Sequence, residues 1–469
     1  MAENNFDLVV IGAGPGGYHA AIRGAQLGLK VAVIEKDDGT GIGGLGGVCL
    51  NWGCIPSKSL LKNAELLNQM KDADEWGFSF DNFHADMGKA VDRSRKVSST
   101  LTQGIGYLLR KNKIELFRGT GRFTSSTTVQ VEGGQELTAT NIVIATGARP
   151  RSLPGLEIDG ESVITSRNAL EMRETPSAIG IVGGGAIGVE FAYYFQAYGA
   201  EVTIFEMLDH LVPNEDEEVS AELERAYRKL GIKYVTGARV AGTERRDGKT
   251  IVNYEAAGEK AEYECDMVLL GIGVAPNSDD IGLEAAGVAL DERGFIPIDG
   301  KMRTNVPNIY CVGDVTGKLL LAHVAFKQGV VAAETIKGME TPDIIYSDMP
   351  RATYCQPQVA SIGLTEAQAK EQGLNVKSGK FMFRGNGKAI ALNEYDGFIK
   401  IVTDAESGEI IGAHMIGPDV TELLAEIGVV KTLEGTPDEI AWTTHAHPTL
   451  SEALMEAALS VEGEAIHGA

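Results

Sequence analysis

The first two thirds of the chain alternate short apolar runs with glycine-rich turns and amphipathic stretches. The apolar runs cover residues 8–11, 31–34, 141–147, 179–182, 202–205, 267–277 and 308–314. Continuous apolar runs of this length predict strands that are buried on both faces of a parallel sheet. Helical patterns follow two of them and end near Leu27 and Tyr198, and residues 55–70 carry apolar side chains at helical spacing.

From about Tyr346 the pattern changes. Alternating strands are predicted at 398–402 and 410–416, with a hairpin turn at 404–408, followed by helices over 420–433 and 452–459. This pattern is typical of an α+β domain without a nucleotide-binding turn. The chain is therefore predicted to be an α/β protein with two Rossmann-like nucleotide-binding domains and a C-terminal α+β domain.

Two glycine turns of the G-x-G-x-x-G type carry this prediction. The first consists of Gly12, Gly14 and Gly17, with Glu35 ending the next strand, and the second of Gly183, Gly185 and Gly188, with Glu206 in the same place. In both copies the acid lies 23 residues after the first glycine. The glycines permit a tight turn, approach of a pyrophosphate and packing of helix on strand, so each copy predicts a dinucleotide site.

Glu206 also predicts which nicotinamide nucleotide binds. A carboxylate at this position accepts hydrogen bonds from a free ribose 2′-hydroxyl and repels a 2′-phosphate. No Arg or Lys lies between Glu206 and Glu218. The sequence therefore favours NAD over NADP.

A pair of cysteines, Cys49 and Cys54, precedes the helix predicted from residue 55. Pro56 suits the first helical turn, and Lys58 adds a positive charge one turn further on. A thiol at a helix N-terminus is stabilised as thiolate, so the pair predicts a redox dithiol. Two buried structural cysteines or half of a metal site are the alternatives. The remaining cysteines, Cys265, Cys311 and Cys355, are scattered singly, which disfavours a metal site.

His447 and Asp314 are two further candidates for functional residues. His447, in a His-x-His pair with His445, is a candidate base for thiol chemistry, with Glu452 near enough in sequence to hold its ring. A metal-binding pair and simple capping residues remain alternatives. Asp314 ends an apolar strand and is a candidate for contacting the polyol or ribose of the first nucleotide, or a turn cap.

Composition narrows the possible partners and compartment. Lys+Arg 42 against Asp+Glu 65 give a net charge of −23, which opposes binding to nucleic acid or anionic membranes. Five cysteines in 469 residues predict a reducing compartment, and neither a signal peptide nor a membrane span is predicted. We expect a cytoplasmic protein or a mature organellar one. The acidic run 214–218 and the basic stretch 93–96 are predicted to be solvated helix faces.

The motifs GAGPGG, GGVCLNWGCIPSK, IVIATG, GGGAIGVE, CVGD and HAHPTLSE occur in this order over nearly the whole chain. In this it closely resembles the disulfide flavoprotein reductases, and within them the dihydrolipoamide dehydrogenases. The resemblance implies FAD in the first site, NAD in the second and a homodimer. It implies FAD-binding parts at 1–150 and 276–345, an NAD-binding domain at 151–275 and an interface domain at 346–469.

The resemblance also implies roles for individual residues. Cys49 would exchange with lipoyl sulfur and Cys54 would contact the flavin, near Lys58 paired with Glu190, while His447, oriented by Glu452, would serve the other subunit. The implied FAD contacts are Gly12, Gly14, Gly17, Glu35, Lys58, Thr146, Gly147, Asp314, Ala322 and His323. The implied NAD contacts are Gly183, Gly185, Gly188, Glu206 and Gly273, and no metal is implied.

The implied partners are lipoyl-bearing subunits of 2-oxoacid dehydrogenase or glycine cleavage complexes. Another NADH-dependent disulfide reductase of the family, or a non-catalytic NAD-binding redox sensor, is the alternative function. Residues 37–47 carry several extra glycines beside the first nucleotide site. We expect these to change the shape of a loop rather than the chemistry.

Overall fold

The computed structural model describes residues 4–36 and 44–468, so most of the glycine-rich loop 37–47 lies outside the described residues. The chain divides into two compact units. The first consists of Met1–Leu60, Gly88–Arg151 and Gly273–Tyr346, and the second of Leu61–Met87, Ser152–Ile272 and Ser347–Ala469. The predicted division into four domain segments stays a prediction.

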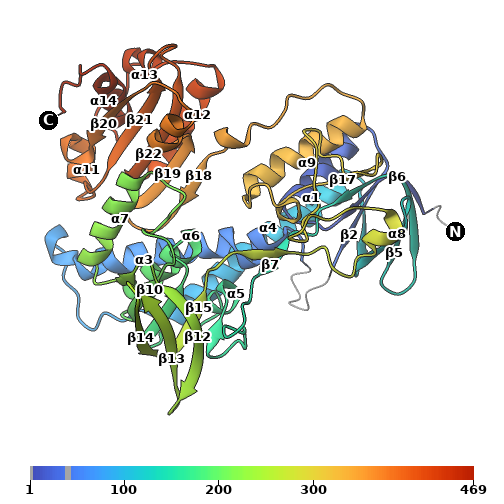
Figure 1. Ribbon diagram of the computed structural model, residues 1–469, viewed down its shortest axis with the longest axis horizontal. Helices are drawn as coiled ribbons and strands as arrows, with labels where there is room; N and C mark the ends of the chain where they lie inside the picture. Colours follow the sequence, from blue (N-terminus) through green and yellow to red (C-terminus); the bar gives the residue numbers. More distant parts are fainter. Residues whose placement is uncertain (1–3, 37–43, 469) are drawn as a thin grey trace. The chain divides into compact units, whose positions relative to one another are not determined.

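The first unit is built on a mainly parallel sheet with the strand order β3-β2-β1-β6-β5-β4, and β17 also pairs with β6 (Figure 1). The strands are β1 (Asn5–Ile11), β2 (Val31–Glu35), β3 (Glu115–Arg118), β4 (Gly121–Ser125), β5 (Thr128–Val131), β6 (Glu136–Ile144) and β17 (Ile309–Cys311). The central strand β1 pairs in parallel with β2 and β6, and β17 runs parallel to β6. The carboxyl ends of β1 and β17 therefore deliver the first glycine turn and Asp314 to the same edge.

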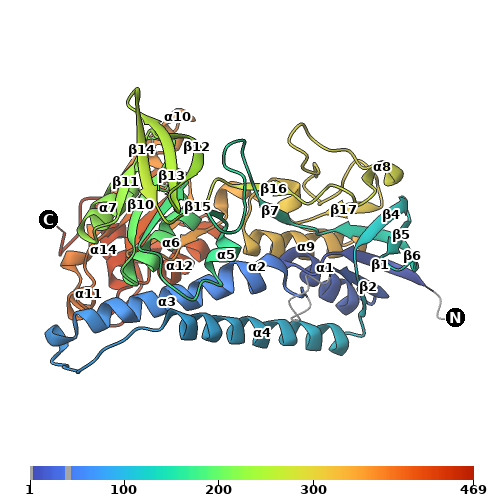
Figure 2. The same cartoon turned by 90° about the horizontal axis from the view of Figure 1, so that it is seen from below.

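Helices α1 (Pro15–Gln26) and α9 (Ala322–Ile336) pack against each other in this unit (Figure 2). A Cβ added at Gly329 would lie 2.3 Å from the carbonyl oxygen of Gly16. Only glycine therefore permits this close approach of the two backbones. The unit also contains α2 (Gly47–Trp52), the start of α3 (Cys54–Lys71), most of α4 (Met87–Lys111), α8 (Leu283–Ala286) and the paired strands β7 (Ala148–Pro150) and β16 (Val274–Pro276).

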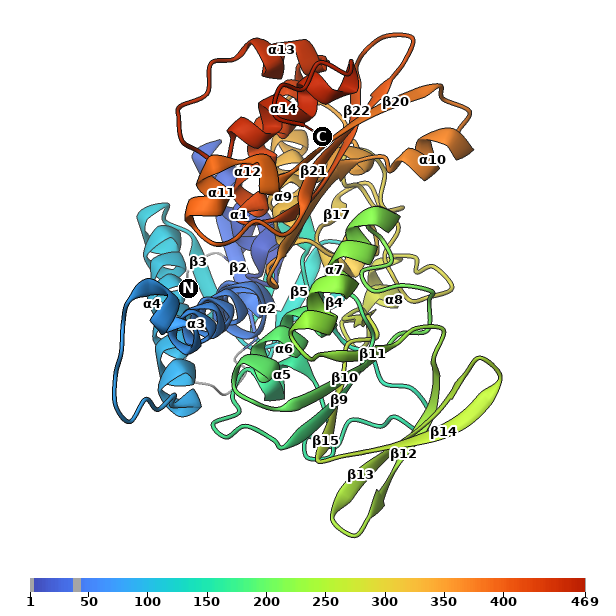
Figure 3. The ribbon, with the colours of Figure 1, turned by 90° about the vertical axis from the view of Figure 1, so that its left-hand side faces the viewer.

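The second unit contains a parallel sheet of strand order β11-β10-β9-β15-β8 and the antiparallel sheet β12-β13-β14, which projects beyond it in Figure 3. Its first part comprises β8 (Val163–Ile164), α5 (Ser166–Ala169), β9 (Ala178–Val182), α6 (Ala186–Ala197), β10 (Glu201–Phe205), α7 (Glu217–Lys229), β11 (Lys233–Val235), β12 (Arg239–Arg246), β13 (Lys249–Ala256), β14 (Glu259–Cys265) and β15 (Met267–Leu270). The strand, turn, helix and strand of the first unit are thus repeated, as the two glycine motifs predicted.

The C-terminal part of the second unit has an antiparallel sheet of order β18-β19-β22-β21-β20. Its elements are β18 (Arg351–Thr353), β19 (Gln358–Gly363), α10 (Glu366–Glu371), β20 (Val376–Met382), α11 (Gly387–Ala391), β21 (Phe398–Asp404), β22 (Ile410–Gly417), α12 (Val420–Thr432), α13 (Pro437–Trp442) and α14 (Glu452–Val461). Buried apolar residues of the sheet pack against α12 and α14 in one core. The predicted α/β fold class with an α+β C-terminal part is confirmed.

Two predictions about charged stretches are only partly right: Asn214, Glu217, Arg93 and Lys96 are exposed as predicted, but other residues of each stretch are not. In the acidic run 214–218, Asp216 is buried beneath Lys400 instead of lying on a solvated face. In the basic stretch 93–96, Arg95 stacks on Trp52 with 4.8 Å between its guanidinium carbon and the ring centroid. Both residues have partners distant in sequence, which a local charge pattern does not reveal.

We searched the described ranges 4–36 and 44–468 for membrane spans. None of their helices is long and apolar enough to cross a bilayer.

Candidate active site

The two predicted redox cysteines lie side by side in the first unit. Cys49 lies within α2 and Cys54 is the first residue of α3, as predicted, with a hydrogen bond between the two thiols. Gly46, at φ 88°, is the N-cap residue of α2, and its N–H donates to the carbonyl of Ala13 over 2.8 Å. The short helix with Cys49 is therefore attached directly to the first glycine turn.

The charges around Cys49 favour a single thiolate in the pair. Hydrogen bonding to Cys54 and burial raise the pKa of Cys49, and the charge of Asp314 adds to this effect. Lys58 acts in the opposite direction and lowers the pKa of Cys49. Two adjacent thiols cannot easily both ionise, because the second negative charge would face the first at short range. The arrangement thus suits exchange through one sulfur at a time.

Side chains of α4 hold α2 in place, and sequence reasoning missed them. The Asn51 amide donates to the Leu45 carbonyl at 3.0 Å and to the Gly47 carbonyl at 2.9 Å. Thr102 donates its hydroxyl to the Asn51 side-chain oxygen at 3.0 Å, and Arg95 donates to the Asn51 carbonyl at 2.7 Å. No local signal in the sequence links α4 to the dithiol, since the contacts span some fifty positions.

The first glycine turn fits a dinucleotide. A Cβ at Gly17 would lie 1.9 Å from the carbonyl oxygen of Gly12, whereas one at Gly14 would meet nothing closer than 3.9 Å. Gly14 caps α1 without a side-chain hydrogen bond, which leaves the first amides of the helix for an anionic ligand. Glu35 accepts a hydrogen bond from the N–H of Ala13 and so lies at the turn.

The second glycine turn repeats this geometry. A Cβ at Gly188 would again lie 1.9 Å from a carbonyl oxygen, that of Gly183, and one at Gly185 would meet nothing within 4 Å. Glu206 accepts hydrogen bonds from the N–H of Gly184 at 2.6 Å and of Leu208 at 2.8 Å. The open space beside each helix N-terminus is what a bound pyrophosphate requires.

Other predicted contacts of the first nucleotide lie at the ends of neighbouring elements. Asp314 follows β17, and burial raises its pKa to about 6. Thr146 donates its hydroxyl to the Asn277 carbonyl at 2.7 Å, and the N–H of Asn277 donates to the carbonyl of Gly147 at 3.0 Å. Ala322 and His323 begin α9, so their backbone amides belong to its first turn. Their predicted contacts with FAD stay predictions.

His447 and Glu452 form the predicted contact. The Nδ1 atom of His447 lies 2.9 Å from Glu452 Oε1, and the N–H of Thr449 donates to the other carboxylate oxygen at 2.8 Å. The backbone contact with Thr449 lowers the pKa of Glu452, burial opposes it, and the His447 hydrogen bond adds to the lowering. His445 makes a second such pair, with its Nε2 2.9 Å from Glu426 on α12. Sequence reasoning left Glu426 out because α12 lies before the histidine motif.

Two predicted positions, Glu190 and Gly273, lie outside the dithiol and the two glycine turns. Glu190, in α6, is buried and accepts a hydrogen bond from the N–H of Tyr354 at 2.9 Å. Gly273, at φ 93°, is the first residue of the last segment of the first unit. Its carbonyl accepts a hydrogen bond from the N–H of Arg151 at 3.1 Å. Lys58 and Glu190 belong to different units, so their pairing stays a prediction, as does the NAD contact of Gly273.

Tyr18 is a further residue near the dithiol that sequence reasoning missed. Burial, with the nearby charge of Cys49, raises the pKa of Tyr18 to about 12. The ring of Tyr18 lies 4.3 Å from that of His19, centroid to centroid. Its position directly after Gly17, in the first turn of α1, is the only signal in the sequence that could have indicated it.

Comparison with known proteins agrees with this geometry. Residues 6–329 match the family model of the pyridine nucleotide-disulphide oxidoreductases, and residues 349–458 match the dimerisation domain of the same family. A dihydrolipoyl dehydrogenase of Mycobacterium leprae is 48% identical over 96% of this chain and 97% of its own. One of Zymomonas mobilis is 46% identical over 100% of both chains.

Solved structures show the same fold. LpdA of Mycobacterium tuberculosis superimposes with a TM-score of 0.88 at 28% identity, covering 96% of this chain and 98% of that one. The HOCl-induced flavoprotein disulfide reductase RclA of Escherichia coli gives a TM-score of 0.85 at 26% identity, covering 96% of this chain and 99% of that one.

Proposed function

Because this chain belongs to the pyridine nucleotide-disulphide oxidoreductase family, we propose that it oxidises dihydrolipoyl groups to lipoyl disulfides with NAD⁺, using FAD. The observation that carries the proposal is the hydrogen-bonded pair of thiols, Cys49 and Cys54, beside the first nucleotide turn. The similarity to full-length dihydrolipoyl dehydrogenases at 48% and 46% identity favours this substrate over that of the 26% identical RclA.

The residues of each nucleotide site fit the two cofactors. Gly14 and Gly185 leave open space at uncapped helix N-termini, and an acid lies at the end of the following strand in both copies. Asp314, half-buried at the edge of the first site, is suited to hydrogen bonds with hydroxyl groups of the FAD chain. Bound FAD supplies a two-electron carrier between the dithiol and NAD⁺.

The reaction begins with the oxidised enzyme, in which Cys49 and Cys54 share a disulfide. One sulfur of the dihydrolipoyl group attacks Cys49 and breaks the disulfide, which leaves Cys54 as thiolate. The second lipoyl sulfur then attacks the first, closes the lipoyl disulfide and releases Cys49. The substrate loses two electrons and two protons, and the enzyme dithiol gains the electrons.

His447 acts as the base that accepts a proton during this exchange. Its Nδ1 is held by Glu452, so its Nε2 is directed away and can accept a proton from the incoming thiol. The Glu452 carboxylate stabilises the imidazolium that results. We propose that this histidine serves the dithiol of the other subunit in a homodimer, and the matched dimerisation domain supports such an assembly.

We further propose that the dihydrolipoyl group arrives on a lipoyl-bearing subunit of a 2-oxoacid dehydrogenase or glycine cleavage complex. We infer a reducing compartment such as the cytoplasm, because the chain has only five cysteines in 469 residues.

The test is NAD⁺ reduction by dihydrolipoamide, measured for the wild type and the Cys49→Ser variant. We expect NADH formation in the wild type and a loss of at least about a thousandfold in the variant, which keeps its flavin. Cys311→Ser is the matched control, since Cys311 is buried in the sheet core and outside the dithiol. Turnover of another disulfide with NADH, but none with dihydrolipoamide, would assign a different substrate within the family.

A further inference from the structure

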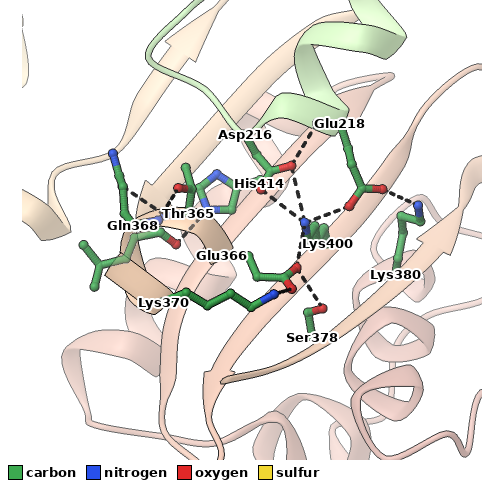
Figure 4. A network of polar contacts seen from close by, with 11 residues as sticks. Asp216, Glu218, Thr365, Glu366, Gln368, Lys370, Ser378, Lys380, Lys400 and His414 are labelled. Carbon is green, nitrogen blue, oxygen red and sulfur yellow. Dashed lines mark hydrogen bonds and ion pairs between the residues drawn. The ribbon is translucent and has the colours of Figure 1, made fainter. Parts of the chain in front are cut away.

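Helix α7 lies directly after the loop that begins at Glu206. Ion pairs fix both ends of this helix, and Figure 4 shows those at its N-terminal end. Residues 206–216 connect the acid of the second nucleotide site to the N-terminus of α7. The partners of α7 belong to the segment 349–458, which matches the dimerisation domain. We call these contacts the α7 clamp: Asp216, Glu218, Arg225 and Lys229 on one side, and Glu366, Lys380, Lys400, Arg384 and Asp396 on the other.

The first part of the clamp surrounds a buried lysine. The Nζ atom of Lys400, on β21, lies 2.7 Å from Glu218 Oε1, 3.0 Å from Glu366 Oε2 and 3.2 Å from Asp216 Oδ2. The side chains of Lys400 and Asp216 are each only 6% exposed. Asp216 also caps α7 by accepting the Glu218 N–H at 3.1 Å, and Lys380 pairs with Glu218. The start of α7 is thus fixed to the sheet.

The charge of Lys400 and the charges of the carboxylates around it depend on one another. Burial alone would lower the pKa of Lys400, but the hydrogen bond to Glu218 and the charge of Asp216 raise it above the usual range. Lys400 and its three carboxylates therefore stabilise one another, although Glu218 also pairs with Lys380 and Glu366 with Lys370. Removing a buried partner leaves uncompensated charge, which is far more costly than loss of a surface ion pair.

The second part of the clamp fixes the other end of α7. Asp396, just before β21, lies 2.7 Å from Lys229 Nζ and 3.0 Å from Arg225, and also 3.2 Å from Arg384 of its own segment. Hydrogen bonds from these bases lower its pKa to about 2, although burial acts in the opposite direction. Two anchors at opposite ends determine both the position and the direction of a helix, whereas one would permit it to pivot.

The loop carrying Glu206 is in turn attached to α7. The N–H of Leu211 donates to Glu224 of α7 at 3.0 Å, and the N–H of Val212 donates to the carbonyl of Gly184 in the glycine turn at 2.8 Å. Glu206 itself accepts from the N–H of Gly184. Displacement of α7 would therefore move the acid that selects NAD and the turn that holds its pyrophosphate.

We propose that Lys400 and Asp396 are positioning residues for NAD, which act through α7 and the 206–216 loop. The inference rests on the proposed function in one respect, that NAD binds beside Glu206. By linkage, NAD then stabilises the clamp as much as the clamp stabilises bound NAD. Residues of the dimerisation segment thereby tune the affinity of the nucleotide site without touching the nucleotide.

The decisive variant is Asp396→Asn, which keeps the shape of the side chain and removes its charge. Binding of ADP-ribose to the holoenzyme is measured by calorimetry, beside steady-state kinetics with NAD⁺ and dihydrolipoamide. We expect Kd for ADP-ribose and KM for NAD⁺ to rise about fivefold, with KM for dihydrolipoamide and kcat changed by less than about twofold. Unchanged ADP-ribose affinity in a folded variant would overturn the proposal, even if its melting temperature fell.

Lys400→Met should show the larger effect, about tenfold in Kd, where it folds. Its matched control is Lys377→Met on β20, which removes a lysine paired at 2.8 Å with Glu462, outside the clamp. This control should bind ADP-ribose like the wild type, and equal weakening in both would contradict a specific role of the clamp. If the wild type binds ADP-ribose but does not oxidise dihydrolipoamide, the proposed function fails. The Kd for ADP-ribose of Asp396→Asn still tests the role of the clamp in that case.

Discussion

Replacing Glu452 by Gln tests how His447 is held. Glu452 uses both oxygens, one for His447 Nδ1 at 2.9 Å and one for the N–H of Thr449 at 2.8 Å. An amide has a single acceptor oxygen, so one of the two donors must lose its partner. The imidazolium that forms during proton transfer also loses its counter-charge.

The size of the effect follows from the contact that is lost. A hydrogen bond to a charged group contributes about 1.5–3 kcal/mol, which corresponds to about 10- to 150-fold in rate. The His447 side chain is 80% exposed in the single chain, so screening by water places our expectation at the lower end, about tenfold in kcat.

The assay compares two reactions of the same holoenzyme. Dihydrolipoamide-driven NAD⁺ reduction needs the histidine, whereas ferricyanide reduction by NADH does not need thiol exchange. Glu456→Gln is the matched control. Glu456 lies on the same helix as Glu452, and its carboxylate contacts another histidine, His467, at 2.7 Å. Equal losses in both reactions of Glu452→Gln, or a kcat within about twofold of the wild type, would refute the reasoning.

Three further predictions concern the nucleotide turns and acid stability. Gly17→Ala places a Cβ 1.9 Å from a carbonyl oxygen, so we expect the purified variant to carry less than about half of the wild-type flavin, measured from its visible spectrum. Gly188→Ala meets the same clash in the second turn, and should retain flavin while its KM for NAD⁺ rises by about tenfold or more. Hydrogen bonds from Lys370 and Lys400 lower the pKa of Glu366 to about 2 from 4.5, so this group contributes stability above pH 4.5 that is lost as the pH falls towards 2. In urea unfolding from pH 5 to about 3, the wild type should therefore lose more free energy of unfolding than Glu366→Gln, and parallel curves would contradict this.

The sequence predicts features that depend on neighbouring residues. Both glycine turns could be recognised because strand, turn, helix and terminal acid follow one another within a short segment, and the structure repeats even the hydrogen bonds from Ala13 to Glu35 and from Gly184 to Glu206. The start of α3 at Cys54 followed from Pro56 and the helical spacing after it.

Features that depend on distant residues were missed. The acidic run at 214–218 has the local composition of a surface helix, but Lys400, 184 positions after Asp216, turns it into a buried ion cluster. The contacts of Thr102 and Arg95 with Asn51, which hold the helix that carries Cys49, were missed for the same reason, since α4 approaches α2 only in the folded chain. A single sequence does not report which distant charges meet.

The most direct test of the account is to identify which thiols NADH generates. The oxidised holoenzyme is treated with NADH without oxygen, denatured and alkylated, and the labelled peptides are identified by mass spectrometry. We predict that Cys49 and Cys54 are alkylated only after NADH, while labelling of Cys265, Cys311 and Cys355 stays the same. Labelling of Cys49 and Cys54 that does not depend on NADH would contradict a redox disulfide between them.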